Sequence, residues 1–214
     1  ETWGWCVEKG YLYAYLSYSG FKRGKMVMDG FWNKAREMGS DMNPYQAGFL
    51  QLVAVADSEQ EAADKFGPHG EYFYNKMLHV YPGFSDAPGY RTLDTVKAGL
   101  LGQTTQFGQR PASLTWKDLL EQGNIIAGTP KQVTEQLESV IKDLHIGHLM
   151  VLNQFGSIPH DLAMANIKKT ATEVLPNLRG IWDGQFEDKW WPHPMRNPQR
   201  PGAILDREGA LAPA

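Results

Sequence analysis

Short apolar stretches alternate along the chain with amphipathic helical patterns. Residues 11–18 and residues 47–56 are apolar or aromatic at both even and odd positions, which is typical of strands buried on both faces. Residues 148–154 predict a third strand of this kind. Helical periodicity precedes, separates and follows these strands. The predicted helices span residues 3–9, 25–38, 58–74, 129–144 and 159–178, with weaker helical character at residues 93–101 and 114–122.

Capping signals mark the starts of two of these helices. Ser58 and Glu61 fit a capping box, in which the hydroxyl accepts an early backbone amide and the carboxylate reaches back toward the start of the helix. Thr129 and Gln132 fit a second one, with a proline at the first helical position. Gly67-Pro68 predicts a kink or a break within the helix that begins at Ser58.

Strands that alternate with amphipathic helices predict right-handed βαβ units and a parallel sheet. A complete (β/α)8 barrel needs eight strands and about 250 residues. Three strands in 214 residues therefore predict an α/β fold that is the C-terminal portion of such a barrel, incomplete in this chain. Residues 1–180 form this portion, with residues 78–123 as an insertion or lid region. Residues 181–214 are an irregular tail rich in Trp and Pro, anchored by its tryptophans Trp182, Trp190 and Trp191.

Composition narrows the class of protein. The chain has 21 basic and 24 acidic residues and a formal net charge of −3, which argues against nucleic acid as a partner. Its longest apolar run, residues 47–56, is well short of the roughly 18 residues of a membrane span, so no membrane partner is expected. The only cysteine, Cys6, rules out a disulfide within the chain and favours a reducing compartment. These features predict a cytoplasmic protein.

Familiar catalytic motifs are missing from the sequence. It has no Gly-x-Ser-x-Gly, no phosphate loop and no Gly-x-Gly-x-x-Gly. His145 and His148 lie across a predicted helix-to-strand turn, and with no cysteine pair nearby we predict no metal site.

Candidate site residues follow from position, because barrel enzymes place their sites at the C-terminal ends of strands. Polar and ring-bearing side chains at these ends suit a pocket for a planar heteroaromatic ligand. Packing against the barrel or an interface is an equally good explanation for Tyr18 at the end of the first strand. Asp57, at the end of the second strand, is better explained by helix capping than by acid–base chemistry. The candidates are Ser17, Tyr18, Asn153, Gln154 and Phe155, with His160 in the first turn of the following helix.

Several segments resemble the C-terminal part of the bacterial luciferase-like flavin-dependent monooxygenases. They are residues 127–133 (Ala-Gly-Thr-Pro-Lys-Gln-Val), 147–150 (Gly-His-Leu-Met), 152–156 (Leu-Asn-Gln-Phe-Gly) and 173–178 (Glu-Val-Leu-Pro-Asn-Leu). The opening residues 1–11, the Pro-Gly-Tyr of residues 88–90 and the Trp-Trp-Pro of residues 190–192 are also similar to the family. The resemblance extends over nearly the whole chain to about residue 192.

The resemblance implies a (β/α)8 barrel enzyme that uses reduced FMN, supplied by a separate flavin reductase. In this family a flavin hydroperoxide inserts one oxygen atom from dioxygen into a small organic substrate, and the protein holds the ring and excludes water. It further implies that Thr2 binds the flavin phosphate at a helix N-terminus, that Ser17 and Tyr18 lie near the ring or the substrate, and that residues 78–123 cover the pocket. Family members pair through barrel helices, which implies a homodimer of the full-length protein.

If the resemblance holds, the first half of the barrel lies outside this sequence. The catalytic residues of the family are expected mainly in that half, so we expect the chain to be a fragment that is inactive by itself. Two alternatives remain open. One is an enzyme of the same fold that uses a deazaflavin and transfers hydride, and the other is a non-catalytic barrel subunit.

Overall fold

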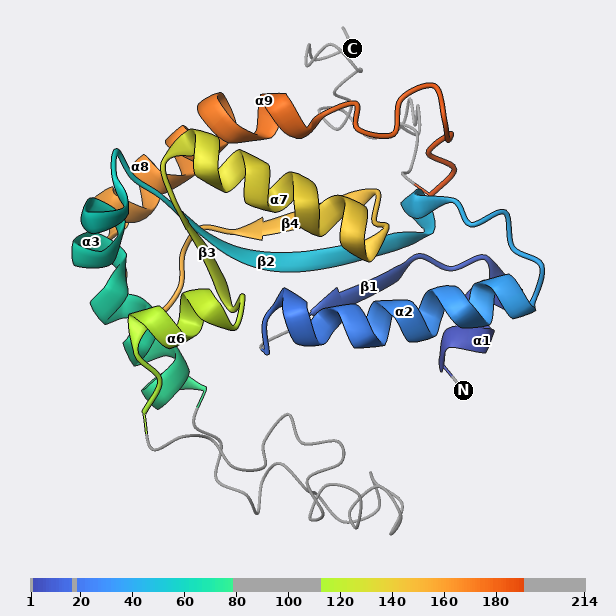
Figure 1. The fold of residues 1–214 in the computed structure, drawn as a ribbon, viewed down its shortest axis with the longest axis horizontal. Helices are drawn as coiled ribbons and strands as arrows, with labels where there is room; N and C mark the ends of the chain where they lie inside the picture. The colour runs from blue at the N-terminus through green and yellow to red at the C-terminus, as the bar shows by residue number, and fades with distance from the viewer. Residues whose placement is uncertain (1, 17–18, 79–112, 191–214) are drawn as a thin grey trace, which may run out of the picture.

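A computed structural model describes residues 2–16, 19–78 and 113–190 of the chain (Figure 1). Helices and strands alternate through these residues. They are α1 (Thr2–Lys9), β1 (Tyr13–Leu16), α2 (Phe21–Glu37), the 3-10 helix η1 (Pro44–Gln46), β2 (Ala47–Val55), α3 (Glu59–Tyr72), the π-helix η2 (Phe73–Met77), α6 (Trp116–Glu121), β3 (Ile125–Gly128), α7 (Pro130–Leu144), β4 (His148–Leu152), α8 (His160–Lys169), the π-helix η3 (Thr170–Val174) and α9 (Leu175–Leu178).

The four strands form one parallel sheet centred on β2. Leu50 of β2 pairs with Leu16 of β1 and with Met150 of β4. Further along β2, Leu52 is paired with both β3 and β4. A strand has only two edges, so β1 and β3 share one edge of β2 and β4 occupies the other. The parallel sheet predicted from the alternating pattern is therefore confirmed.

The order of neighbouring strands determines which face each helix covers. In a closed barrel β3 would lie between β2 and β4, whereas here the chain returns from β2 to the side of β1 before it crosses to β4. Right-handed crossovers then require α3 and α6 to lie on the opposite face of the sheet from α2 and α7. The longest strand, β2, takes the centre, where eight of its nine residues are buried.

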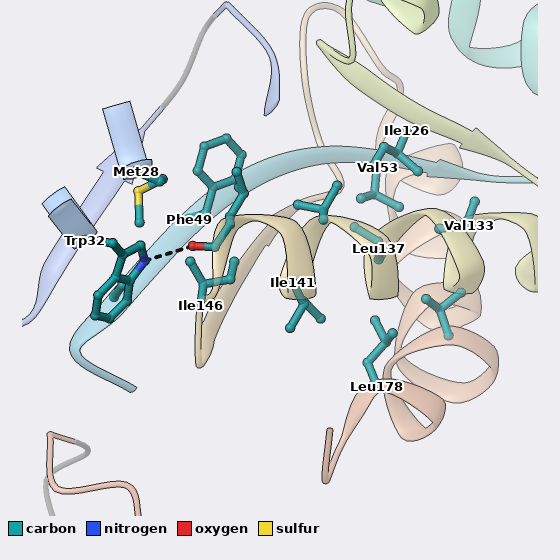
Figure 2. Close-up of a cluster of buried hydrophobic side chains, with 14 of the residues drawn as sticks. Met28, Trp32, Phe49, Val53, Ile126, Val133, Leu137, Ile141, Ile146 and Leu178 are labelled. Atoms are coloured by element: carbon teal, nitrogen blue, oxygen red, sulfur yellow. Dashed lines mark hydrogen bonds between the residues drawn. The ribbon is translucent and has the colours of Figure 1, made fainter. Parts of the chain in front are cut away.

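Two hydrophobic clusters lie on these two faces. The first joins α2, α7 and α9 to one face of β2, and Figure 2 shows Met28, Phe49 and Leu137 within it. The indole nitrogen of Trp32 donates a hydrogen bond of 3.0 Å to the carbonyl of Leu144 and ties α2 to the end of α7. The second cluster packs α3 and α6 against the other face of the sheet, near the C-terminal half of β2.

The prediction that every strand is buried on both faces is right for β2 and wrong for β1 and β4. Tyr13 of β1 packs into the first cluster and stacks on Phe31 with ring centroids 4.7 Å apart. Its neighbour Ala14 is exposed, and the exposed fractions of Leu16 and Met150 are 43% and 38%. Both strands are outer strands of the described sheet, and α3 and α6 cover the second face mainly at β3 and the end of β2.

Strand β3 was not predicted, and the count of three strands was therefore wrong. It has only four residues, too few to show an alternating pattern, although Ile125 and Ile126 are each only 1% exposed. The side-chain amide of Gln51 fills the gap between β1 and β3 on their shared edge of β2. It donates hydrogen bonds to the carbonyls of Gly123 and Asn124, at 3.3 and 3.1 Å.

A kink or a break was predicted at Gly67-Pro68, and helix α3 does not break there. It continues through Pro68 to Tyr72 and then widens into the π-helix η2. Glycines on this helix permit close packing of α6, because a Cβ added at Gly70 would lie 3.2 Å from the Trp116 ring and 2.8 Å from Ile125. The apolar contacts of this packing stabilise the helix, which offsets the single backbone hydrogen bond that a proline removes.

Residues 181–190 contain no helix or strand and lie along the amino ends of the sheet. Trp182 donates a hydrogen bond of 2.8 Å to the carbonyl of Ile146, and Trp190 donates one of 2.8 Å to the carbonyl of Gly10. Trp191 lies outside the described residues, as do the predicted helix at residues 93–101 and most of the predicted insertion. Within the described part of the chain, no helix combines the length and apolarity needed to cross a membrane.

Candidate functional site

The candidate site is the carboxyl edge of the sheet, which is the side of the sheet where the C-terminal ends of its parallel strands lie. Ligands of parallel α/β folds bind at this side. The ends of β2 and β3 are joined directly, since the amide of Ala56 donates a hydrogen bond of 3.0 Å to the carbonyl of Gly128. Side chains at the starts of the next helices join them again, because Gln132 of α7 donates a hydrogen bond to Glu59 of α3. The N-termini of α3 and α7 therefore lie side by side (Figure 1).

Both helix N-termini are capped by their own side chains. Thr129 and Gln132 form the predicted capping box, which is confirmed. Gly128 precedes it with a φ of +144°, and a Cβ there would lie 2.7 Å from the amide oxygen of Gln132. Glycine is therefore required where β3 turns into α7, and the free amides that an anion would bind are partly occupied already.

At α3 the cap extends one residue further than the sequence predicted. Ser58 accepts a hydrogen bond of 3.1 Å from the amide of Glu61, but the carboxylate of Glu61 reaches back to the amide of Asp57, at 2.7 Å. Hydrogen bonds from Lys65 and from the Asp57 amide lower the pKa of Glu61. The carboxylate of Asp57 pairs with Lys169, and this contact raises the pKa of Lys169. Asp57 is exposed, Glu61 and Lys169 are half-buried, and the group links the start of α3 to α8.

The buried side-chain amide of Asn166, on α8, forms hydrogen bonds with the backbone of β2 beyond the point where β4 ends. Its side-chain oxygen accepts from the amide of Val55 at 2.9 Å, and its nitrogen donates to the carbonyls of Val53 at 2.8 Å and Asn153 at 2.9 Å. Asn166 is 1% exposed. These hydrogen bonds take the place of those that a neighbouring strand would make with β2 here. They hold α8 against the carboxyl edge of the sheet.

Asn166 is the residue of this edge that sequence reasoning missed. It lies four residues after Leu162 and next to Ile167, on the side of α8 that packs against the sheet. A polar residue at an apolar position of an amphipathic helix was the available signal, because buried polar groups need hydrogen-bond partners.

The structure places the predicted pocket residues after β4 in different surroundings. Asn153 is half-buried and donates to Val53 at 3.3 Å and to the hydroxyl of Thr170 at 2.8 Å. Phe155 is 2% exposed and packs between the rings of Phe66 and Phe73. Gln154 and His160 are exposed, so these two side chains are open to a ligand at the edge.

Of the remaining predicted site residues, only Thr2 lies among the described residues, and the structure does not bring it together with this group. Thr2 begins α1 and is exposed. Helix α1 packs on the C-terminal half of α2, where Trp3 lies over Gly30, away from the carboxyl end of β2 (Figure 1). Ser17 and Tyr18 lie outside the described residues.

Among residues 2–16, 19–78 and 113–190, no group of three or more His, Cys, Asp or Glu side chains could hold a metal ion. His145 contacts the carbonyl of Met42 at 2.7 Å and packs between Trp32 and Trp182. His148 faces Asp188 at 3.8 Å. At the described carboxyl edge, the amide of Gln154, the imidazole of His160 and the charged pair of Asp57 and Lys169 can orient a polar ligand.

Solved structures of two monooxygenases are similar to this chain in fold. One is the oxygenating constituent of 3,6-diketocamphane monooxygenase from Pseudomonas putida, a type II Baeyer-Villiger monooxygenase in complex with FMN. Its TM-score is 0.52 at 19% identity, over 82% of this chain and 45% of that protein. The other is the monooxygenase RslO1 from Streptomyces bottropensis. Its TM-score is 0.53 at 12% identity, over 81% of this chain and 44% of that protein.

The chain spans less than half the length of these two proteins. No protein-family model and no curated protein matches its sequence. The similarity confirms the predicted fold class, an α/β structure whose parallel sheet corresponds to part of a luciferase-like barrel.

Proposed function

We propose that this chain is part of a luciferase-like flavin-dependent monooxygenase, which uses reduced FMN from a separate reductase to insert one oxygen atom of dioxygen into a small organic substrate. The observation that carries the proposal is the fold match to an FMN-bound monooxygenase over 82% of this chain. Two of the four segments that resemble the family in sequence, residues 127–133 and 152–156, also fall on elements that form the carboxyl edge, namely the start of α7 and the loop after β4.

The described residues fit only part of a flavin site. The caps of α3 and α7 use their own hydroxyls, and the amides of Asn153 and Asn166 bind the backbone of the sheet. At the described carboxyl edge, Lys169 is paired with Asp57. We propose that protein outside this chain completes the flavin site and the barrel, and that the chain by itself is inactive.

Within this proposal the residues at the edge have distinct tasks. Gln154 and His160 face the substrate, because both are exposed polar side chains, one in the loop after β4 and the other at the start of α8. Asn153 and Phe155 hold that loop in place through the contacts described above. Thr2 lies away from this edge (Figure 1) and Ser17 and Tyr18 lie outside the described residues, so their role as flavin ligands stays a prediction. Bound reduced FMN would supply the electrons that activate dioxygen, and the protein would orient the substrate and exclude water.

Titration with reduced FMN under anaerobic conditions tests the proposal. The 214-residue chain and the longer protein encoded by the same reading frame extended upstream are compared by isothermal calorimetry. We expect binding by the longer protein and at least about 100-fold weaker binding by the chain alone. Absence of FMN binding by the longer protein would overturn the assignment, whereas equal binding by the two would overturn the claim that the site is shared.

The alternatives give different results in the same titration. A hydride-transferring enzyme of this fold would bind a deazaflavin in preference to FMN, and a non-catalytic barrel subunit would bind neither. Variants Gln154→Ala and His160→Ala should raise KM for the substrate while FMN affinity stays within about twofold. The exposed Gln136→Ala on the outer side of α7 is the matched control.

A further inference from the structure

A cavity of about 310 Å³ lies at the amino end of β4, at the opposite end of the sheet from the candidate site. It is open to solvent on one side and lies between the end of α7, the first residues of β4 and the chain that follows α9. Figure 2 shows Ile141, Ile146 and Leu178 of its wall. Leu149, Ile181 and Trp182 complete an apolar lining. The volume is at the lower end of the range of ligand pockets, about 300–1,000 Å³.

The wall of this cavity is held in place by the core and by hydrogen bonds. Ile146 is fully buried, and the Trp182 indole donates to its carbonyl at 2.8 Å. The amide of Gly147 donates to the carbonyl of Pro44 at 2.7 Å, and a Cβ at Gly147 would lie 2.5 Å from the Tyr45 ring. The cavity is therefore preformed, which lowers the entropic cost of binding.

Charge is distributed unevenly around the cavity. Arg179, directly after α9, lines it and is exposed. Among residues 2–16, 19–78 and 113–190, no carboxylate lies within ion-pair distance of its guanidinium. On the side of Tyr45, burial and the carboxylates of Asp183 and Asp188 raise the tyrosine pKa. An anionic group is therefore attracted to the Arg179 side and repelled from the Tyr45 side.

We propose that this cavity binds a small monocarboxylic acid with a compact apolar body, such as one ring on a short chain. The apolar body lies against Ile146, Leu149 and Trp182, and the carboxylate pairs with Arg179. A guanidinium is the side chain best shaped to bind a carboxylate by two parallel hydrogen bonds. The site is independent of the proposed flavin site, because it uses neither the carboxyl edge nor protein outside this chain.

The test uses 4-phenylbutyrate and its neutral analogue 4-phenylbutyramide as probes. Binding to the 214-residue chain is measured by calorimetry and by methyl NMR shifts of Ile141, Leu149 and Ile181. We expect the acid to bind about tenfold more tightly than the amide, with shifts at these methyls. In Arg179→Gln, the affinity for the acid should fall to that for the amide, and the affinity for the amide should not change.

Two further variants separate the proposal from a surface effect. Arg36→Gln removes an exposed arginine of α2 that contacts Asn33, and it should leave both affinities unchanged. Ile181→Trp, in the half-exposed loop after α9, should fill the cavity and abolish binding of both probes. Equal affinity for acid and amide in the unchanged chain, absence of binding, or an equal loss in Arg36→Gln would each overturn the proposal.

Discussion

The two faces of the sheet differ in how completely they are covered. The face toward α2 and α7 is covered from β1 to β4 by one continuous cluster. The opposite face is covered by α3 and α6 near β3 and the end of β2, while Ala14, Leu16 and Met150 are exposed. The first face supports the fold of this chain, and the uncovered half of the second is the surface where protein outside this chain would complete the proposed barrel.

Truncation on the covered face should have the largest effect. Phe49→Ala removes a fully buried ring of β2 and should lower the free energy of unfolding by about 3–5 kcal/mol. Leu16→Ala, on the uncovered face, should cost less than about 1 kcal/mol. Urea unfolding followed by circular dichroism measures both. Similar losses in the two variants would mean that the second face is covered in solution.

The second largest loss of stability is expected when the buried side-chain amide of Asn166 is removed. Asn166→Leu leaves the amide of Val55 without its partner and removes the tie between α8 and β2. We expect a loss of about 2–3 kcal/mol in the free energy of unfolding, because the buried backbone amide loses its hydrogen bond. Asn33→Ala, at an exposed position of α2, is the control and should change stability by less than about 0.5 kcal/mol. Equal effects would show that Asn166 does not bind the sheet edge.

Two glycine substitutions distinguish a steric requirement from backbone strain alone. Both Gly128 and Gly39 have positive φ, but only at Gly128 would a Cβ meet another group, the Gln132 side chain. Gly39→Ala should cost about 1 kcal/mol from strain. Gly128→Ala should cost about 1 kcal/mol more, since it also disrupts the cap of α7. The difference between the midpoints of urea unfolding checks this, and a smaller cost at Gly128 would contradict it.

The uncovered face should promote self-association of the chain. Leu16→Glu places a charge on this face and should reduce the fraction of oligomers in light scattering after size exclusion, without loss of stability. Met26→Glu is the control, because Met26 is 75% exposed on α2, away from this face. An equal reduction by both variants would mean that added charge, and not the sheet face, is responsible.

The smallest effect should be the pH dependence of the cap of α3. The pKa of Glu61 in the folded chain is below its ordinary value of 4.5. Its contribution to stability is therefore present above pH 4.5 and is lost as the pH falls through the folded pKa. The difference in unfolding midpoint between the unchanged chain and Glu61→Gln should be largest near neutral pH and shrink below pH 4.5. A difference that does not change with pH would refute this role.

The sequence was informative where local chemistry determines structure. The capping box at Thr129 and the apolar stripe of α7 lie where the pattern placed them, because both depend on residues within one or two turns. Strand β3 was missed because four residues carry too little periodicity. The break expected at Pro68 does not occur, because packing of Trp116 and Ile125 at the helix glycines stabilises α3.

At the candidate site, position along the chain identified the loop after β4 and the start of α8, but it did not identify which of their side chains are accessible. Phe155 lies in the core and Asn153 binds backbone, while Gln154 and His160 are exposed. Asn166, which holds α8 against β2, bonds to residues more than 100 positions earlier, and no local pattern can predict such a partner.

The sequence by itself determined the alternation of helices and strands, the helix starts and the parallel direction of the sheet, since each follows from periodicity and capping over short distances. Only the tertiary structure decided the order of the strands around β2, which face each helix covers, and which polar side chains are buried. These depend on competition between distant segments for the same edge or face, and that competition is settled by total burial and hydrogen bonding, which no single segment contains.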